Sequence, residues 1–326
     1  MKFKSFTQLA KTIVVIPMAF ASLVAAAASY PDKPVRIVVP AGPGSNPDLI
    51  ARIYAQKLGE LYNQSFYVEN KSGAGGSIGL SYASKLAPDG YSLVIGALGN
   101  MAINPSVYAN LQYDARRDFI PVAQLVKSPL VLASRANSSI RTLADLIAQA
   151  KAKPAQLTFS SGGNGTGQHL SGEYLKTSAA ITLTHIPFKG TPASIIGVAS
   201  GDVDVVFGNQ AAVWPLVKSG KLNALAVTSK TRLPQYPETP TVDETLPDFE
   251  IYDWSGFIVP TGTPAEIVND LHAKLMKIQA MPDVRKQLEM SGFIPVESTR
   301  EEFKDFINRE HQKWGSVAKR VNIKLD

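Results

Sequence analysis

Residues 157–170 read LTFSSGGNGTGQHL. A short apolar run is followed by serines and four glycines, and the residues that come next, HLSGEYLK, have the pattern of a helix. A loop between a strand and a helix can surround an anion with backbone N–H groups, because the first turn of a helix leaves its donors unpaired. Thr166 is the expected N-cap of this helix. The stretch therefore predicts an anion-binding loop inside an α/β unit.

Two other segments repeat this order of apolar strand, small-residue loop and helix start. In IVVPAGPGSNPDL (37–49), Asn46 can cap a helix that has Pro47 at its first position, and in VVFGNQAAVW (205–214) the cap is Asn209. One such cap is usually structural. Three of them favour a binding site, because ligands of α/β sheets bind beyond the carboxyl ends of the strands.

Apolar runs alternate with helical periods along the whole chain. VRIVVP (35–40) precedes apolar residues at helical spacing over 47–62, and LVLAS (130–134) and VDVVFGN (203–209) are also followed by helical patterns. This alternation predicts an α/β fold in which helices flank the sheets.

Two capping boxes are expected in the C-terminal third. Thr263 with Glu266, and Thr299 with Glu302, have the Ser/Thr-x-x-Glu spacing in which side chain and backbone cap each other. Each pair predicts the start of a helix.

Residues 1–28 are expected to be a cleaved export signal. Three lysines precede the apolar stretch 12–28, and Ala26 and Ala28 fit a small-residue cleavage site before Ser29. The alternative is a membrane anchor, but the stretch is short for the ~20 residues of a span. The chain has no cysteine, so an exported protein of this kind suits a bacterial periplasm. We therefore expect a periplasmic protein.

The net charge gives no reason to expect a nucleic-acid partner. Removal of the three lysines of the signal lowers the formal net charge from +6 to +3, which is too mild for such a partner.

The length predicts two domains. The chain from Ser29 onward has 298 residues, more than the ~150 typical of one domain. A proline-rich segment over 232–256 has no helical period and reads as a connector. We expect the chain to cross between domains near residue 130 and to return near 253. One lobe then comprises 30–129 and 254–326, and the other 130–253.

The motifs of enzymes, nucleotide sites and metal sites are incomplete in this sequence. GGSIG (75–79) matches the nucleophile elbow at Ser77, but NKSGA (70–74) separates it from the preceding strand, whereas a true elbow follows the strand directly. The glycine-rich stretches lack the complete phosphate-binding and dinucleotide motifs. No zinc or calcium motif is present either. We expect no catalysis, no cofactor and no metal; a hydrolase using Ser77 is the remaining enzymatic alternative.

Three single residues allow two interpretations each. His169 either packs in the first helical turn or contacts a ligand. Lys189 is either a solvated loop lysine or a partner for a ligand carboxylate. Trp254 either lines a cleft or belongs to the core.

Several motifs together resemble the Bug family, the periplasmic substrate-binding proteins of tripartite tricarboxylate transporters. They include YPDKPVRIVVPAGPGSNPDLIAR, VENKSGAGGSIG, SSGGNGTGQHLSGEYLK, HIPFKG and GTPAEIVNDLHAKL, and they follow the family's order over nearly the whole mature chain. The resemblance implies a two-lobed periplasmic-binding-protein fold, type II-like, whose cleft closes by a hinge without catalysis. It also implies a small carboxylate ligand, held mainly by backbone N–H groups, hydroxyls and water.

The sequence departs from the family's pattern at two loops. Ser45 stands where the first loop usually has a second glycine, and the third loop has Gly208, Asn209, Gln210 and Ala211 instead of Asp-Asn-Leu-Pro. An acid in the third loop could hold a ligand ammonium. Its absence favours a dicarboxylate or an aromatic acid over an amino acid.

We expect a monomeric receptor that delivers its ligand to membrane transporter subunits. A binding module that feeds a signalling partner is the alternative. The residues expected to bind the ligand are Ala41, Gly44, Ser45, Asn46, Gly99, Asn100, Ser160, Ser161, Asn164, Gly165, Thr166, His169, Gly208, Asn209 and Trp254.

Overall fold

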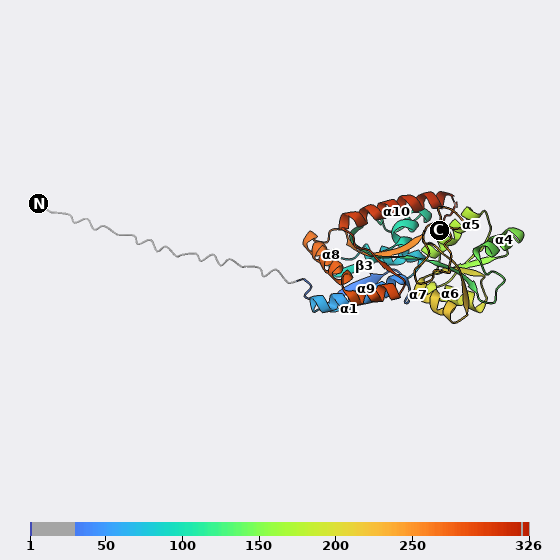
Figure 1. Cartoon of the computed structure of the whole chain (residues 1–326). Helices are drawn as coiled ribbons and strands as arrows, with labels where there is room; N and C mark the ends of the chain where they lie inside the picture. The colour runs from blue at the N-terminus through green and yellow to red at the C-terminus, as the bar shows by residue number, and fades with distance from the viewer. Residues whose placement is uncertain (2–29, 321, 326) are drawn as a thin grey trace.

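The computed structural model describes residues 1, 30–320 and 322–325 (Figure 1). The expected export signal, apart from Met1, lies outside the described residues. Across 30–320 and 322–325, no helix has both the length and the apolar character that crossing a membrane requires.

The first of two sheets is built from both ends of the chain. Its six strands have the order β11-β4-β10-β3-β1-β2, with β1 parallel to β2 and β3, and β10 antiparallel to β3 and β4. The strands are β1 (Val35–Val39), β2 (Phe66–Asn70), β3 (Ser92–Ala97), β4 (Phe119–Pro129), β10 (Tyr252–Pro260) and β11 (Ile294–Pro295). We call the part of the molecule around this sheet the first lobe.

The second sheet is built from the middle of the chain. Its five strands have the order β7-β6-β8-β5-β9, with β6 parallel to β7 and β8, and β5 antiparallel to β8 and β9. The strands are β5 (Val131–Arg135), β6 (Thr158–Ser161), β7 (Thr184–Pro187), β8 (Val205–Gly208) and β9 (Leu222–Val227). We call the part around this sheet the second lobe. The α/β class expected from the sequence is confirmed.

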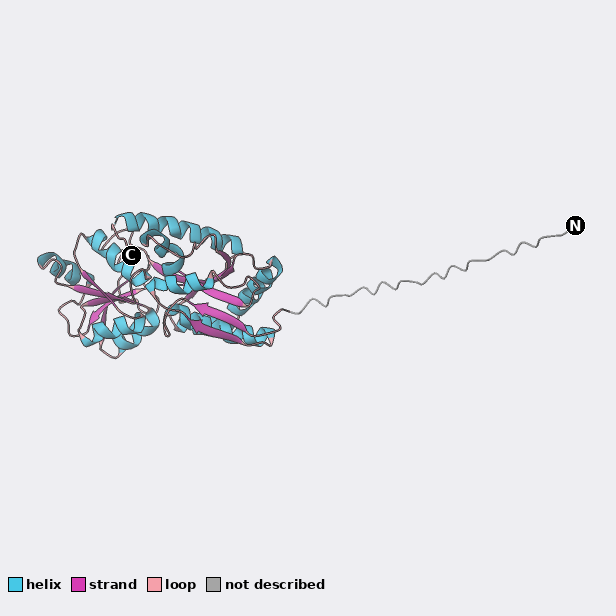
Figure 2. Ribbon diagram, turned by 180° about the vertical axis from the view of Figure 1, so that it is seen from behind, coloured by secondary structure: helices cyan, strands magenta, loops and turns pink. Residues whose placement is uncertain are grey.

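Helices cover both faces of the first sheet (Figures 1 and 2). The alternation of side chains along β1 sends Ile37 and Val39 into a core shared with Tyr54 and Leu271, while Val38 enters a second core on the opposite face. The helices of this lobe are α1 (Asn46–Tyr62), α2 (Ser77–Ala83), α3 (Asn104–Val107), α8 (Ala265–Gln279), α9 (Pro282–Met290) and α10 (Arg300–Arg320), with the short turns η1 (Ala74–Gly76) and η2 (Gly99–Ile103).

The second sheet is covered in the same way. Ile195 and Trp214 pack in a core on one face, and Leu146 and Leu170 pack on the other. The second of these cores continues into the first lobe, where Trp314 of α10 belongs to it. The helices are α4 (Leu143–Ala152), α5 (Gly167–Ala179), α6 (Thr191–Ser200) and α7 (Gln210–Lys218).

The two connections between the sheets lie side by side. The chain leaves the first sheet at Pro129 and returns to it at Tyr252, close to the expected crossings. The buried Thr228 joins the two connections: its Oγ1 accepts from Leu130 N at 2.8 Å and donates to Ile251 O at 2.7 Å. The exact lobe boundaries stay a prediction.

Candidate functional site

A cavity of about 450 Å³ lies between the lobes. The loops that follow β1, β3, β6 and β8 all contribute to it, as expected for the carboxyl ends of strands in α/β sheets. Its lining consists of residues 40–42, 45–47, 72–76, 162–164, 166–168 and 188–191, together with Ala97, Gly99, Asn100, Leu130, Asn209 and Asp253.

Four of the longer helices begin at the cavity wall. The first turn or N-cap of α1, α5, α6 and α7 contributes Asn46, Gly167, Thr191 and Asn209 respectively. Each helix N-terminus offers N–H donors and a partial positive charge of about half a unit. The cavity is therefore suited to an anion, although Lys189 is the only cationic side chain in the lining among the described residues.

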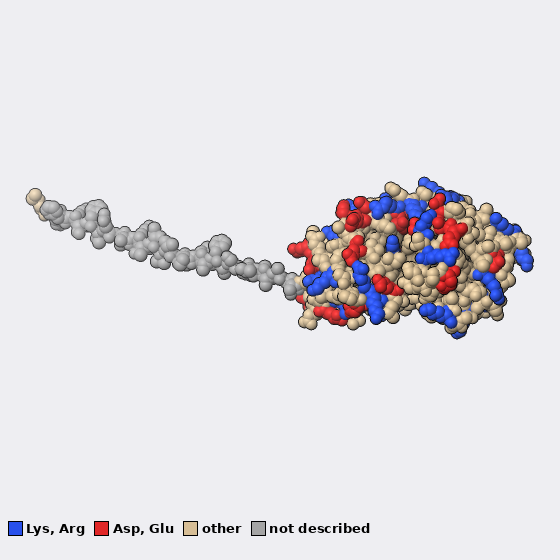
Figure 3. Space-filling model, in the orientation of Figure 1, with Lys and Arg blue, Asp and Glu red and all other residues tan. Residues whose placement is uncertain are grey.

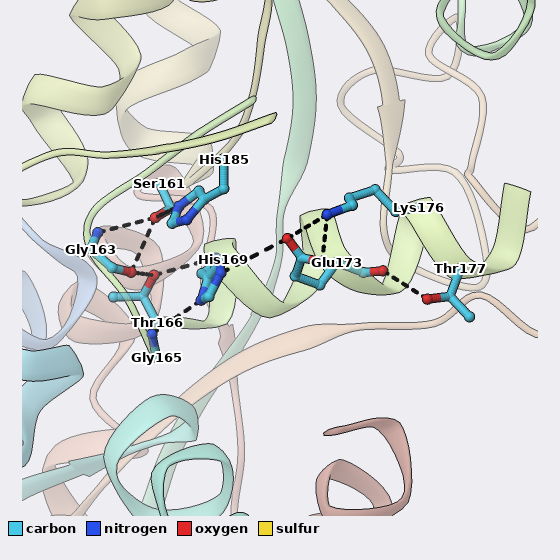
Figure 4. Close-up of polar contacts among 9 residues, drawn as sticks. All are labelled: Ser161, Gly163, Gly165, Thr166, His169, Glu173, Lys176, Thr177 and His185. Atoms are coloured by element: carbon cyan, nitrogen blue, oxygen red, sulfur yellow. Dashed lines mark hydrogen bonds and ion pairs between the residues drawn. The ribbon is translucent and has the colours of Figure 1, made fainter. Parts of the chain in front are cut away.

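The glycine-rich loop quoted first is held in shape by its own polar groups (Figure 4). Thr166 is the N-cap of α5, as expected, and its Oγ1 accepts from His169 N at 3.3 Å and donates to Gly163 O at 2.7 Å. Gly165 N donates to His169 Nδ1 at 3.2 Å, so this nitrogen is the unprotonated one. The loop thus reaches the cavity already ordered.

Two uncharged histidines pack against the glycine-rich loop. The rings of His169 and His185 stack with centroids 4.0 Å apart, and His185 Nε2 lies 2.7 Å from Ser161 Oγ. Burial, reinforced by the nearby Lys176, lowers the pKa of His169 to about 3 and that of His185 to about 4. Both rings are uncharged at neutral pH, and they support the loop by packing and hydrogen bonding.

The first loop begins its helix one residue earlier than expected. Ser45, and not Asn46, is the N-cap of α1, and its Oγ donates to Gly42 O at 2.7 Å instead of capping the helix. Asn46 is thereby free to reach across the cavity wall, where its Oδ1 accepts from Asn209 Nδ2 of the second lobe at 2.8 Å.

Further contacts join the lobes around the cavity. Gln210 Nε2 donates to Gly292 O at 2.7 Å, and Tyr108 OH donates to Asn164 O at 3.4 Å. At Gly165, with φ +76°, an added Cβ would lie 2.5 Å from Asn104 Oδ1 of the first lobe. The described conformation therefore has its lobes in contact, and Gly165 lies at that contact.

The structure brings eight of the fifteen predicted site residues to the cavity lining. That they contact a ligand stays a prediction. The eight are Ala41, Ser45, Asn46, Gly99, Asn100, Asn164, Thr166 and Asn209.

The other seven are not part of the lining. Ser160, Ser161 and His169 are buried beneath the glycine-rich loop, and Gly165 faces the first lobe. Gly44 donates its N–H to Asp48 Oδ2 at 2.9 Å. An added Cβ at Gly208 would lie 2.4 Å from Val213 Cγ2, so Gly208 allows α7 to pack closely. The seventh residue is Trp254.

Trp254 is a core residue. Only 1% of it is exposed; its ring packs edge-on against Phe303 and Phe306, and its Nε1 donates to Glu310 Oε2 at 3.1 Å. Of its two sequence interpretations, the structure supports the core. Since side chains alternate along a strand, the preceding residue, Asp253, faces the cavity instead.

Sequence reasoning missed several parts of the lining. The turn 72–76 was read as an incomplete enzyme or nucleotide motif and as part of the family resemblance, but not as part of the ligand site. Gln168 and Thr191 were not predicted, and Asp253 was overlooked although the alternation with Trp254 indicates that it faces the other side of the strand. Asp253 accepts from Asn46 Nδ2 at 3.3 Å, and burial raises the pKa of its carboxyl to about 6.

The contacts of Ser77 are structural. It is the first residue of α2, and its Oγ accepts from Asn104 Nδ2 at 2.9 Å. In the described part of the chain, no three His, Cys, Asp or Glu side chains are grouped so that they could hold a metal ion.

Comparisons with known proteins identify relatives of this fold. The sequence profile described as "Tripartite tricarboxylate transporter family receptor" matches residues 50–323. The chain is similar to the structure of R. palustris Rpa4515 with adipate, with 33% identity, a TM-score of 0.87, and coverage of 90% of this chain and 99% of that one. The structure of the periplasmic binding protein BugD is 29% identical, with a TM-score of 0.86 and coverage of 90% of this chain and 99% of that one. The structure of MatC (Rpa3494) from Rhodopseudomonas palustris with bound malate is 27% identical, with a TM-score of 0.84 and coverage of 88% of this chain and 99% of that one. The expected two-lobed periplasmic-binding-protein fold is confirmed.

Proposed function

Because the chain belongs to the tripartite tricarboxylate transporter receptor family, we propose that it is a periplasmic receptor that closes around a small carboxylate and delivers it to a membrane transporter. The observation that carries this proposal is the convergence of four helix N-termini and two glycine-rich segments, 72–76 and 162–167, on one cavity between two lobes. Family members are solute-binding receptors, and no catalytic step is proposed here.

Both the cavity and the related structures support a small carboxylate as the ligand. The cavity volume of about 450 Å³ suits a small molecule, and its donors suit an anion. Rpa4515 was solved with adipate and MatC with malate, both of which carry two carboxylates. Dicarboxylates are therefore the first candidate ligands. Aromatic acids stay candidates from the sequence resemblance, and Asp253 makes amino acids candidates as well.

We propose that the described conformation is the closed one. The hinge would consist of the two connections joined by Thr228, because they are the places where the chain passes between the sheets. We further propose that the receptor binds its ligand as a monomer.

The recipient is proposed from the family. A membrane transporter is favoured over a signalling partner because the matching profile describes a transporter receptor. On the face shown in Figure 3, basic and acidic side chains are interspersed, which gives no support to a nucleic-acid partner.

A thermal-shift screen of dicarboxylates, aromatic acids and amino acids tests this function. A ligand at 100 times its Kd stabilises the folded chain by about 2.7 kcal/mol, so at least one acid should raise the melting temperature by several degrees. The matched control is the amide of that acid, which should give no shift because it lacks the negative charge. If none of the acids raises the melting temperature, the proposal is contradicted.

A further inference from the structure

Asp253 is the one acidic side chain that lines the cavity within residues 30–320 and 322–325. Its Oδ2 accepts from Asn46 Nδ2 at 3.3 Å, and its Oδ1 accepts from Trp254 N at 3.1 Å. Both donors are neutral, and an ionised carboxylate has about four lone-pair sites. The side chain can therefore accept further hydrogen bonds from the cavity.

The charge of Asp253 fixes the direction of a chain of hydrogen bonds. An ionised carboxylate only accepts, so Asn46 must present Nδ2 to it and keep Oδ1 for Asn209. Asn209 then donates with Nδ2, at 2.8 Å, and its Oδ1 is left as an acceptor. Asn209 is 3% exposed, and its Oδ1 has no partner among the described residues. This part of the wall thus presents acceptors.

A different part of the wall presents donors. Gln168 is 6% exposed; its Oε1 accepts from Gly162 N at 2.7 Å, while its Nε2 is buried with no partner among the described residues. It lies in the first turn of α5, whose N–H groups also favour an anion. Leaving a buried polar atom without a hydrogen bond costs free energy. A ligand that accepts from Gln168 Nε2 and donates to Asn209 Oδ1 would satisfy both unpaired atoms.

We propose that Asp253 determines specificity by selecting carboxylates that carry a hydroxyl or an ammonium group on the carbon chain. That group donates to Asp253, and a carboxylate of the same ligand faces the donors of Gln168 and the glycine-rich loop. This inference rests on the proposed carboxylate receptor and narrows its ligands. The lack of an acid in the third loop argued against amino acids, but Asp253 supplies an acid to the same cavity from β10.

Calorimetric titration with matched ligands tests the inference. Succinate, malate and aspartate share one carbon chain and differ by hydrogen, hydroxyl or ammonium at one carbon; glutarate, 2-hydroxyglutarate and glutamate repeat the series with one more carbon. We expect a substituted acid to bind the wild-type chain at least about tenfold more tightly than its unsubstituted parent, because a hydrogen bond to a charged group is lost in the parent.

Asp253→Asn should reduce that ratio to about twofold or less, because the neutral amide cannot replace the charged acceptor. Asp305→Asn, the same change on an exposed face of α10, should leave the ratio as in the wild type. Equal or tighter binding of the parent acid, a preference that survives in Asp253→Asn, or binding of none of the six acids while another unsubstituted carboxylate binds would each overturn the inference. None of these results touches the proposed function, which fails only if the thermal-shift screen finds no carboxylate at all.

Discussion

At the scale of single residues, the carboxyl of Asp253 makes the stability of the folded chain depend on pH. Its carboxyl has a pKa of about 6 in the folded chain, against about 3.9 in an unfolded chain, because burial disfavours the charged form. Between these two values the folded state binds more protons than the unfolded state. The contribution of this group to stability is therefore fully present below about pH 4 and is lost as the pH rises through 6.

Asp253→Asn should remove this pH dependence. The difference in unfolding free energy between variant and wild type should shift in favour of the variant by on the order of 2–3 kcal/mol as the pH rises from 4 to 7.5. Urea titrations at several pH values measure it, and groups common to both proteins cancel. A difference that stays constant with pH would show that the carboxyl has an ordinary pKa in the folded chain.

At the scale of elements, the glycine-rich loop closes against the first lobe at Gly165. Valine there would place Cβ 2.5 Å from Asn104 Oδ1 and would be strained at φ +76°. Because that contact joins the lobes, the change should disfavour the conformation in which they touch.

Gly165→Val should weaken ligand binding at least about tenfold, because the clash with Asn104 penalises the conformation in which the lobes touch, and a penalty of about 1.4 kcal/mol already makes a tenfold change. The matched control is Gly220→Val, which has φ +68° but no neighbouring atom within 4 Å of the added Cβ. Calorimetry with the acid found in the screen compares the two. Equal affinities in both variants would mean that the loop does not approach the first lobe on binding.

Local signals predicted the elements better than they predicted the site. The Thr299–Glu302 capping box is confirmed, with Thr299 N donating to Glu302 Oε2 at 2.8 Å and Glu302 N donating to Thr299 Oγ1 at 3.2 Å. The expected box at Thr263 is wrong: Thr263 Oγ1 donates to Pro260 O at 2.7 Å, and Pro264 is the N-cap of α8. A backbone acceptor nearby in the turn competes for the hydroxyl, and spacing alone does not reveal this competition.

The missed parts of the site depend on contacts between distant segments. The turn 72–76 lines the cavity and lies close to the second lobe. At Gly75 the approach is so close that an added Cβ would lie 2.6 Å from Asn164 O. Asp253 reaches the cavity only because β10 inserts between β3 and β4. Neither pairing has a local sequence signal; alternation with Trp254 indicates only that Asp253 faces the other side of its strand. The loops after β1, β6 and β8 were predictable because each carries its own strand and helix start.

At the scale of the whole molecule, the proposed capture of a ligand requires two lobes that move about a small hinge. The cavity opens only if the contacts between the lobes are broken while the pair of connections at Thr228 stays intact. These contacts include Asn46 with Asn209, Gln210 with Gly292 and Tyr108 with Asn164. Few polar contacts hold the lobes together in this way, so a ligand that binds both walls can shift the balance toward closure.

Small-angle X-ray scattering, with and without the acid found in the screen, measures this closure. We expect a larger radius of gyration without ligand, and a fall toward the roughly 19 Å of a compact chain of about 300 residues when the acid is saturating. Gly165→Val at the same saturation should contract less than the wild type. Identical scattering curves for the wild type with and without a saturating acid would contradict closure around the ligand.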